Sequence, residues 1–112
     1  MIAQDGVLCP RTIAAIGAAR EAGIHVLIAT GRMFRSVLPY ARAAGIEEPL
    51  ICYQGAAVVE PATGEFLLHE PIPLELAREA IAAVQAERFG LNCYVDDELY
   101  VAEITPNARA YA

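Results

Sequence analysis

A short apolar run, Ile24–Ala29, constrains the fold of this chain more than any other feature. It is rich in β-branched residues, follows Gly23 directly, and is interrupted only by His25. Such a run is typical of a strand that is covered on both faces, as in a parallel sheet. We therefore predict an α/β protein with this strand inside the sheet, and we expect His25 to be a buried core residue rather than a catalyst.

Helices are predicted on both sides of this strand. Pro10 suits the first position of a helix, because its missing N–H would be unpaired there, and Gly23 supplies a left-handed end. A second helix is expected from about residues 35–37 to residue 44, because Pro39 is tolerated in a first turn. A second buried strand at 50–53 completes a helix–strand–helix–strand order, which favours a doubly wound parallel sheet with right-handed crossovers.

The pattern changes after Gly55, where hairpin signals replace buried strands. Turn residues and prolines divide this half into a hairpin, a stiff linker, an amphipathic helix and a second hairpin. Two domains are predicted, residues 1–70 and residues 71–112. The predicted elements are strands 57–60 and 65–69, the latter ended by His69, a linker at 70–73, a helix over 74–88 with Leu74, Ala77, Ile81 and Val84 on its apolar side, and strands 91–95 and 99–101 around Asp96-Asp97-Glu98.

Composition excludes several classes of function. The 112 residues include eight Arg but no Lys, so lysine-dependent phosphate loops and Schiff bases are excluded. Ser36 is the only serine and has no Gly-x-Ser-x-Gly setting, which excludes a nucleophile elbow. The cysteines, Cys9, Cys52 and Cys93, are too far apart for a zinc site. A net charge of −6 argues against nucleic acid. Without a signal peptide or an apolar span, we expect a reduced cytoplasmic protein that does not enter membranes.

Thr30-Gly31-Arg32 is the segment that suggests a ligand-binding site. It follows the carboxyl end of the first predicted strand, where ligands of open α/β sheets bind. Thr30 supplies a hydroxyl, Gly31 permits close approach, and Arg32 adds a cation, which together would hold a phosphoryl group. The alternative is ordinary helix capping by Thr30 with Arg32 in solvent.

The order of motifs resembles the haloacid dehalogenase superfamily, in its Cof-type branch, along essentially the whole chain. Residues 28–32 resemble the second motif of that family, and Cys9-Pro10-Arg11-Thr12 resembles its Ser-Pro-Arg-Thr helix opening. Residues 51–56 resemble its Ile-Cys-x-Asn-Gly-Ala strand end. The resemblance implies a three-layer α/β/α Rossmann-like core, partial here, followed by the start of an α+β cap of the C2 type.

The resemblance also implies roles for individual residues. Thr30 would hydrogen-bond the transferring phosphoryl oxygens, with Gly31 and Arg32 beside it. Gln54 and Gly55 would line the rim of the site, although Gln54 stands where the family usually has Asn. Asp96 and Asp97 resemble carboxylates available for metal or acid–base work, but two adjacent Asp residues in a hairpin turn are more often simply solvated.

Family members hydrolyse phosphate esters of small metabolites with Mg²⁺, through an aspartyl-phosphate intermediate. The nucleophile motif Asp-x-Asp-Gly-Thr, the lysine and the late acidic residues are missing from this sequence, and Asp5-Gly6-Val7-Leu8 resembles a turn that follows the nucleophile strand. The resemblance therefore implies a fragment that lacks the nucleophile motif, the Mg²⁺ ligands and the C-terminal core.

Two functional hypotheses follow from these observations. The first is a fragment of a Mg²⁺-dependent phosphomonoester hydrolase, inactive by itself. The second is a non-catalytic remnant of that fold that binds phosphate or another protein. In either case an uncovered sheet edge would promote self-association.

Overall fold

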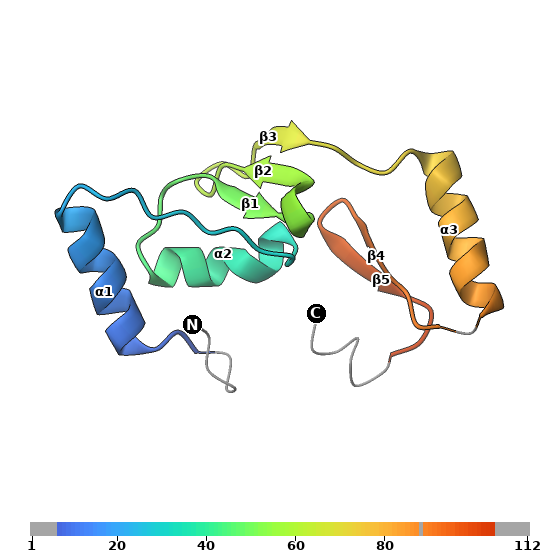
Figure 1. Cartoon of the computed structure of the whole chain (residues 1–112), viewed down its shortest axis with the longest axis horizontal. Helices are drawn as coiled ribbons and strands as arrows, with labels where there is room; N and C mark the ends of the chain where they lie inside the picture. Colours follow the sequence, from blue (N-terminus) through green and yellow to red (C-terminus); the bar gives the residue numbers. More distant parts are fainter. Residues whose placement is uncertain (1–6, 88, 105–112) are drawn as a thin grey trace. The chain divides into compact units, whose positions relative to one another are not determined.

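The computed structural model describes residues 7–87 and 89–104 and divides into two compact units, Met1–His69 and Glu70–Ala112 (Figure 1). Its mixture of helices and strands confirms the predicted α/β class. The interpretation of these units as part of a core and the start of a cap stays a prediction. The first unit contains α1 (Pro10–Glu21), α2 (Phe34–Ala43), β1 (Leu50–Cys52), the 3₁₀ turn η1 (Tyr53–Gly55), β2 (Ala57–Val59) and β3 (Phe66–His69), and the second contains α3 (Leu74–Ala86), β4 (Asn92–Val95) and β5 (Glu98–Val101).

Helix α1 begins and ends as the sequence predicts. Pro10 occupies its first position, and Gly23 has a φ of 80° just beyond the last turn. The Gly23 N–H donates to Arg20 O at 2.9 Å, and the Ile24 N–H donates to Ala19 O at 3.0 Å. This pair of bonds is a Schellman motif, which satisfies carbonyls that the helix end leaves unpaired.

The predicted strand at 24–29 is only partly formed. Ala29 makes an isolated parallel bridge with Ile51, so the expected parallel direction is confirmed. Ile24 and Leu27, however, are 58% and 55% exposed, so burial on both faces was wrong for the described residues. The apolar sequence sets an extended conformation, but a buried strand also needs neighbours at both edges and cover on both faces. The described residues supply β1 at one edge only.

Helix α2 begins at Phe34 and runs through Pro39, which lies in its second turn. The expectation that Pro39 would confine the regular helix to a start at residues 35–37 was wrong. Phe34, Val37 and Ala41 are buried on one face of α2, and this packing offsets the hydrogen bond that Pro39 cannot donate.

An antiparallel sheet in the order β1-β2-β3 forms the rest of the first unit. The predicted hairpin between residues 57 and 69 is confirmed, with a register shift between Val58 and Val59. The antiparallel pairing of β2 with β1 was not predicted. In Figure 1, α2 lies along this sheet. The buried hydrophobic residues are Leu8, Met33, Phe34, Val37, Ala41, Ala44, Ile46, Leu50, Cys52, Ala57 and Val59.

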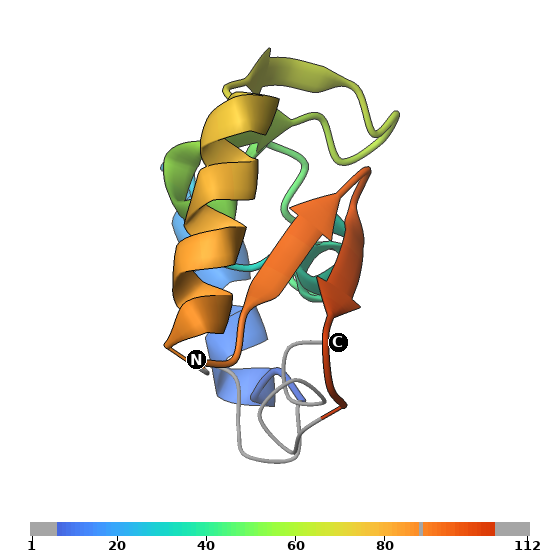
Figure 2. The ribbon, with the colours of Figure 1, turned by 90° about the vertical axis from the view of Figure 1, so that its right-hand side faces the viewer.

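Among the described residues, the second unit contains α3 and, after a short connection, the β4–β5 hairpin (Figure 2). Both predicted elements are confirmed, with two corrections. Leu74 is 63% exposed, because it stands at the first turn of α3, whereas the rest of the predicted apolar side is half-buried. Asp96 and Asp97 alone form the turn, because their φ angles of 51° and 58° suit a two-residue hairpin turn and Glu98 already pairs with Val95. Arg88, the predicted end of the helix, lies outside the described residues.

Candidate functional site

Two loops meet where β1 and the extended segment beside it end. The Gln54 N–H donates to Thr30 O at 3.2 Å, and the Tyr53 N–H donates to Arg32 O at 3.1 Å. One step earlier, the Thr30 N–H donates to Ile51 O at 2.9 Å. The loop Thr30–Arg32 is therefore fixed to the turn Tyr53–Gly55 by main-chain bonds. Both lie at the carboxyl ends of neighbouring parallel segments, where open α/β sheets bind their ligands.

The Tyr53–Gly55 turn has an unusual backbone. Its three residues have φ angles of 52°, 59° and 95°, all in the left-handed region. Glycine adopts this conformation freely, whereas Tyr53 and Gln54 carry a Cβ that disfavours it. The turn persists because Cys52 before it and Ala57 after it are buried, at 0% and 1% exposed. The sequence signals this turn only through Gly55.

Gly31 lies directly against the Gln54 side chain. A Cβ built on Gly31 would overlap the Gln54 amide group, with its Cδ at 2.7 Å and its Oε1 at 3.1 Å. Gly31 thus lets the two loops approach closely. Gln54, which the sequence places on the rim of the site, covers the Gly31 backbone.

Thr30 and Arg32 are joined within their own loop. The Arg32 N–H donates to Thr30 Oγ1 at 3.2 Å, so the Thr30 hydroxyl retains its own proton for another acceptor. The Gly31 N–H has no hydrogen-bond partner within residues 7–87 and 89–104. This loop therefore offers an O–H and an N–H donor at neighbouring positions.

The Arg32 guanidinium extends forward along α2. Its Nη1 donates to Ser36 Oγ at 3.0 Å, and its Cζ lies 6.0 Å from the centroid of the Tyr40 ring. No carboxylate pairs with Arg32 in the described part of the chain. Its positive charge is therefore not neutralised locally, which leaves it available to an anion.

A pocket of about 120 Å³ has Thr30, Arg32 and Tyr40 in its wall, and apolar side chains such as Ile28 and Val37 in the remainder. Of the five residues predicted for the site, the structure places Thr30 and Arg32 at this pocket. Gly31 and Gln54 lie against each other, and Gly55 ends the adjoining turn. Sequence reasoning did not identify Ser36 and Tyr40, although their spacing of four and eight residues from Arg32 was a usable signal.

The described residues do not form a Mg²⁺ site. No group of three or more His, Cys, Asp or Glu side chains among them could hold a metal ion. Asp96 and Asp97 lie at the tip of the β4–β5 hairpin in the second unit. Asp5, in the segment that resembles a family turn, lies outside the described residues.

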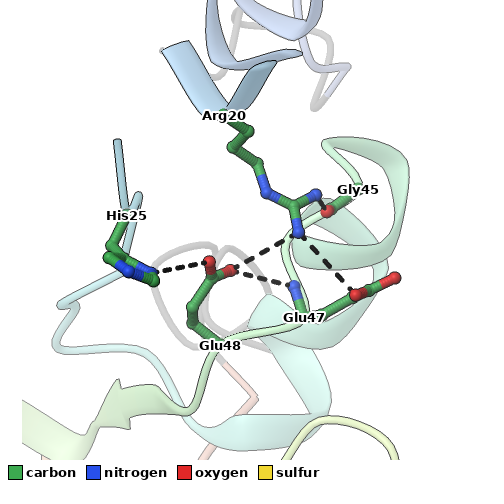
Figure 3. Close-up of polar contacts among 5 residues, drawn as sticks. All are labelled: Arg20, His25, Gly45, Glu47 and Glu48. Carbon is green, nitrogen blue, oxygen red and sulfur yellow. Dashed lines mark hydrogen bonds and ion pairs between the residues drawn. The ribbon is translucent and has the colours of Figure 1, made fainter. Parts of the chain in front are cut away.

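A charged cluster joins the end of α1 to the loop before β1 (Figure 3). Arg20 donates to Gly45 O, and its Nη2 lies 3.7 Å from Glu47 and 3.9 Å from Glu48. His25 Nδ1 lies 3.7 Å from Glu48, and the His25 side chain is 85% exposed. The expectation of a buried core His25 was therefore wrong, because the segment's outer side has no cover in the described residues.

The pKa of the Glu48 carboxyl lies below its ordinary value of 4.5. The main cause is the hydrogen bond from its own backbone N–H, and the Arg20 charge, the Glu47 N–H and His25 add to the effect despite some desolvation. The cluster thus links the end of α1 and the segment after it to the loop before β1.

The model of one protein family, haloacid dehalogenase-like hydrolase, matches residues 1–111. Pyridoxal phosphate phosphatase YbhA of Escherichia coli (strain K12) is 30% identical over 99 residues, which cover 88% of this chain and 36% of that protein. A haloacid dehalogenase-like hydrolase from B. subtilis is similar in structure, with a TM-score of 0.81 and 21% identity over 95% of this chain and 37% of that one.

BT1666 of Bacteroides thetaiotaomicron, among the phosphatases of this superfamily, has a TM-score of 0.73 and 20% identity over 97% of this chain and 40% of its own. The chain thus spans less than half the length of the relatives it matches. Across residues 7–87 and 89–104, no helix has the length and apolar character needed to cross a bilayer.

Proposed function

Because this chain belongs to the haloacid dehalogenase-like hydrolases, in their Cof-type branch, we propose that its Thr30–Arg32 loop binds the phosphoryl group of a small phosphorylated metabolite. The observation that carries this proposal is the Arg32 guanidinium, which no described carboxylate neutralises, beside the donors of Thr30 and Gly31. A charged fork next to O–H and N–H donors is the recognition chemistry of a phosphate.

Each residue of the loop has a separate task in this proposal. The Thr30 hydroxyl donates to one phosphoryl oxygen while its Oγ1 accepts the Arg32 N–H. The Gly31 N–H donates to a second oxygen, and Arg32 offsets the negative charge. Gln54 and Gly55 form the rim of the site, where the Gln54 side chain lies against Gly31.

The name of the Escherichia coli relative guides the choice of substrate. That protein is a pyridoxal phosphate phosphatase, so a phosphate ester that carries an aromatic ring is the first class of ligand to test here. The aromatic and aliphatic side chains beside Thr30 and Arg32 are compatible with a ring attached to the phosphate.

We propose that the 112-residue chain binds such esters without hydrolysing them. The longer family members use Mg²⁺ and an aspartyl-phosphate intermediate, and none of the three Asp residues here occupies the nucleophile position of the family pattern. Mg²⁺ would supply charge neutralisation in those longer family members. The alternative hypothesis, a non-catalytic phosphate-binding remnant of the fold, predicts the same binding. The flanking DNA separates the two hypotheses, because an in-frame Asp-x-Asp-Gly-Thr upstream would favour the hydrolase fragment and its absence would favour the remnant.

Calorimetric titration of the chain with phenyl phosphate, with phenol as the matched ligand, tests the proposal. We expect saturable binding of phenyl phosphate only, weakened by Thr30→Val and retained by Thr30→Ser, which keeps the hydroxyl. Equal binding of phenol, or no effect of Thr30→Val, would contradict it. Incubation with 4-nitrophenyl phosphate and Mg²⁺ should release no nitrophenol, and robust turnover would overturn the inactivity of the chain.

We also propose that the chain self-associates through the outer edge of residues 24–29. Ile28 O and the Thr30 N–H face β1, so the main-chain groups of Leu27 and Ala29 face away, without a described partner. Leu27 is also 55% exposed. Open edges of this kind pair with other chains, and a charge on them prevents it. In sedimentation velocity, we expect association of the wild-type chain that increases with concentration and is lost in Leu27→Lys, and a wild-type monomer throughout would contradict this.

A further inference from the structure

Ser36 is the third residue of α2, and its hydroxyl bonds a side chain that precedes the helix. It lies in the first turn of α2, and the N-cap of that helix, Met33, makes no side-chain capping bond. The Ser36 Oγ instead accepts a hydrogen bond from Arg32 Nη1 at 3.0 Å. The chain's only serine is therefore committed to a guanidinium that lies one turn before it.

Tyr40 lies one helical turn beyond Ser36, on the same side of α2. Residues four apart on a helix lie one above the other, so Arg32 extends along a row formed by Ser36 and Tyr40. The ring of Tyr40 lies under the Arg32 guanidinium, with Cζ 6.0 Å from the ring centroid. That distance is at the outer limit of a cation–π contact, so Tyr40 adds apolar support more than attraction.

The helix that carries these two side chains is itself well fixed. Phe34, Val37 and Ala41, on another face of α2, are 8%, 3% and 0% exposed. Ser36 and Tyr40 are therefore presented by a rigid element, whereas Arg32 belongs to a loop. A flexible cation loses affinity because its side chain must be ordered when it binds, and support from a rigid element reduces that loss.

We propose that Ser36 and Tyr40 are positioning residues that hold the Arg32 guanidinium in the wall of the pocket it shares with Thr30, ready to meet a phosphoryl oxygen. This inference rests on the proposed phosphate site, and it assigns to α2 a part in ligand recognition. If Ser36 and Tyr40 had a purely structural role, their substitution would have the same effect whether or not Arg32 is present.

The test uses the full 112-residue chain and orthophosphate as the probe. Dissociation constants come from backbone amide shifts in the wild type and in Ser36→Ala, Ser36→Thr, Tyr40→Leu and Tyr40→Phe, each also made in an Arg32→Ala background. We expect Ser36→Ala and Tyr40→Leu each to weaken binding about twofold to tenfold. Ser36→Thr and Tyr40→Phe should retain it, because they keep the hydroxyl and the ring.

In the Arg32→Ala background, neither Ser36→Ala nor Tyr40→Leu should weaken binding further. Equal losses in both backgrounds would overturn the positioning role. A second readout needs no ligand: the Arg32 Nε–H order parameter should fall in Ser36→Ala and recover in Ser36→Thr, and an unchanged value would overturn the proposal. If Arg32→Ala leaves orthophosphate binding intact while Ser36→Ala still mobilises the guanidinium, the proposed phosphate site fails, and with it the recognition role of α2, although the contact itself is real.

Discussion

The two units of this chain differ in how their loops are supported. Every described residue that is both hydrophobic and buried belongs to the first unit, between Leu8 and Val59. Helix α3, in the second unit, contains no buried residue, and Val95 and Tyr100 of the hairpin are 52% and 54% exposed. Packing therefore holds the candidate site in the first unit, whereas main-chain hydrogen bonds within α3 and between β4 and β5 hold most of the described second unit.

The same contrast separates two turns with similar backbones. Tyr53–Gly55 and Asp96–Asp97 both have left-handed φ angles. Asp tolerates that conformation and favours hairpin turns, so the second turn follows from its own sequence. Tyr53 and Gln54 do not favour it, so buried strands on both sides must impose the first. Strain imposed by packing is common at functional sites, which agrees with the position of this turn beside Thr30–Arg32.

The largest expected effect comes from the buried core of the first unit. Leu50 is 0% exposed, so Leu50→Ala should lower the free energy of unfolding by about 2–5 kcal/mol. Ile81→Ala in the half-buried face of α3 should cost less than about 1 kcal/mol. Urea titrations followed by amide signals of each unit measure both changes. Equal losses would show that the two units do not differ in packing.

The two turns should respond differently to glycine. Gln54→Gly removes a left-handed Cβ and should raise the free energy of unfolding by about 1 kcal/mol. Asp97→Gly, the matched substitution in the hairpin, should gain less, because Asp already tolerates this conformation. Thermal unfolding of both variants gives the comparison. A larger gain from Asp97→Gly would mean that the strain lies in the second unit.

A smaller change in the free energy of unfolding is expected when the contact between Gly31 and Gln54 is altered. Gly31→Ala overlaps the Gln54 amide, but that group is the end of a flexible side chain and can rotate away. We expect a loss in the free energy of unfolding below about 1 kcal/mol, together with a shifted Gln54 amide signal. The same substitution in a Gln54→Ala background should cost nothing, and a persistent loss there would place the clash elsewhere.

The smallest expected effect concerns the surface cluster of Figure 3. Because the Glu48 pKa in the folded chain lies below 4.5, its contribution to stability is fully present above that pH. It is lost as the pH falls through the lower folded value. Glu48→Gln should therefore flatten the acid side of the stability–pH profile and leave the neutral side nearly parallel to wild type. An unchanged acid limb in urea titrations at several pH values would contradict this.

The sequence predicted those features that depend on local chemistry. Pro10 and Gly23 bounded α1, and the turn residues at 61–64 located the first hairpin, because capping and turn formation involve neighbours in the chain. Burial of residues 24–29 was predicted wrongly, since it depends on what covers them. The apolar pattern of residues 24–29 does not say whether other parts of the chain cover them.

The candidate site shows the same division. Thr30, Gly31 and Arg32 were identified because they follow an apolar run directly. The left-handed conformation at Gln54 and its approach to Gly31 were not, because they arise from two segments more than twenty residues apart. The support of Arg32 by Ser36 and Tyr40 was missed for another reason. Their spacing places both side chains on one side of α2, but only the structure shows that the Ser36 hydroxyl accepts from the guanidinium.

Mapping of backbone amide shifts during an orthophosphate titration of the wild-type chain tests the central claim most directly. The account predicts saturable shifts at Thr30–Arg32 and at Tyr53–Gly55, which hydrogen bonds join to that loop. Signals of Asn92–Val101 in the second unit should stay in place. Shifts confined to the second unit, or spread evenly over both units, would contradict a phosphate site at Thr30–Arg32.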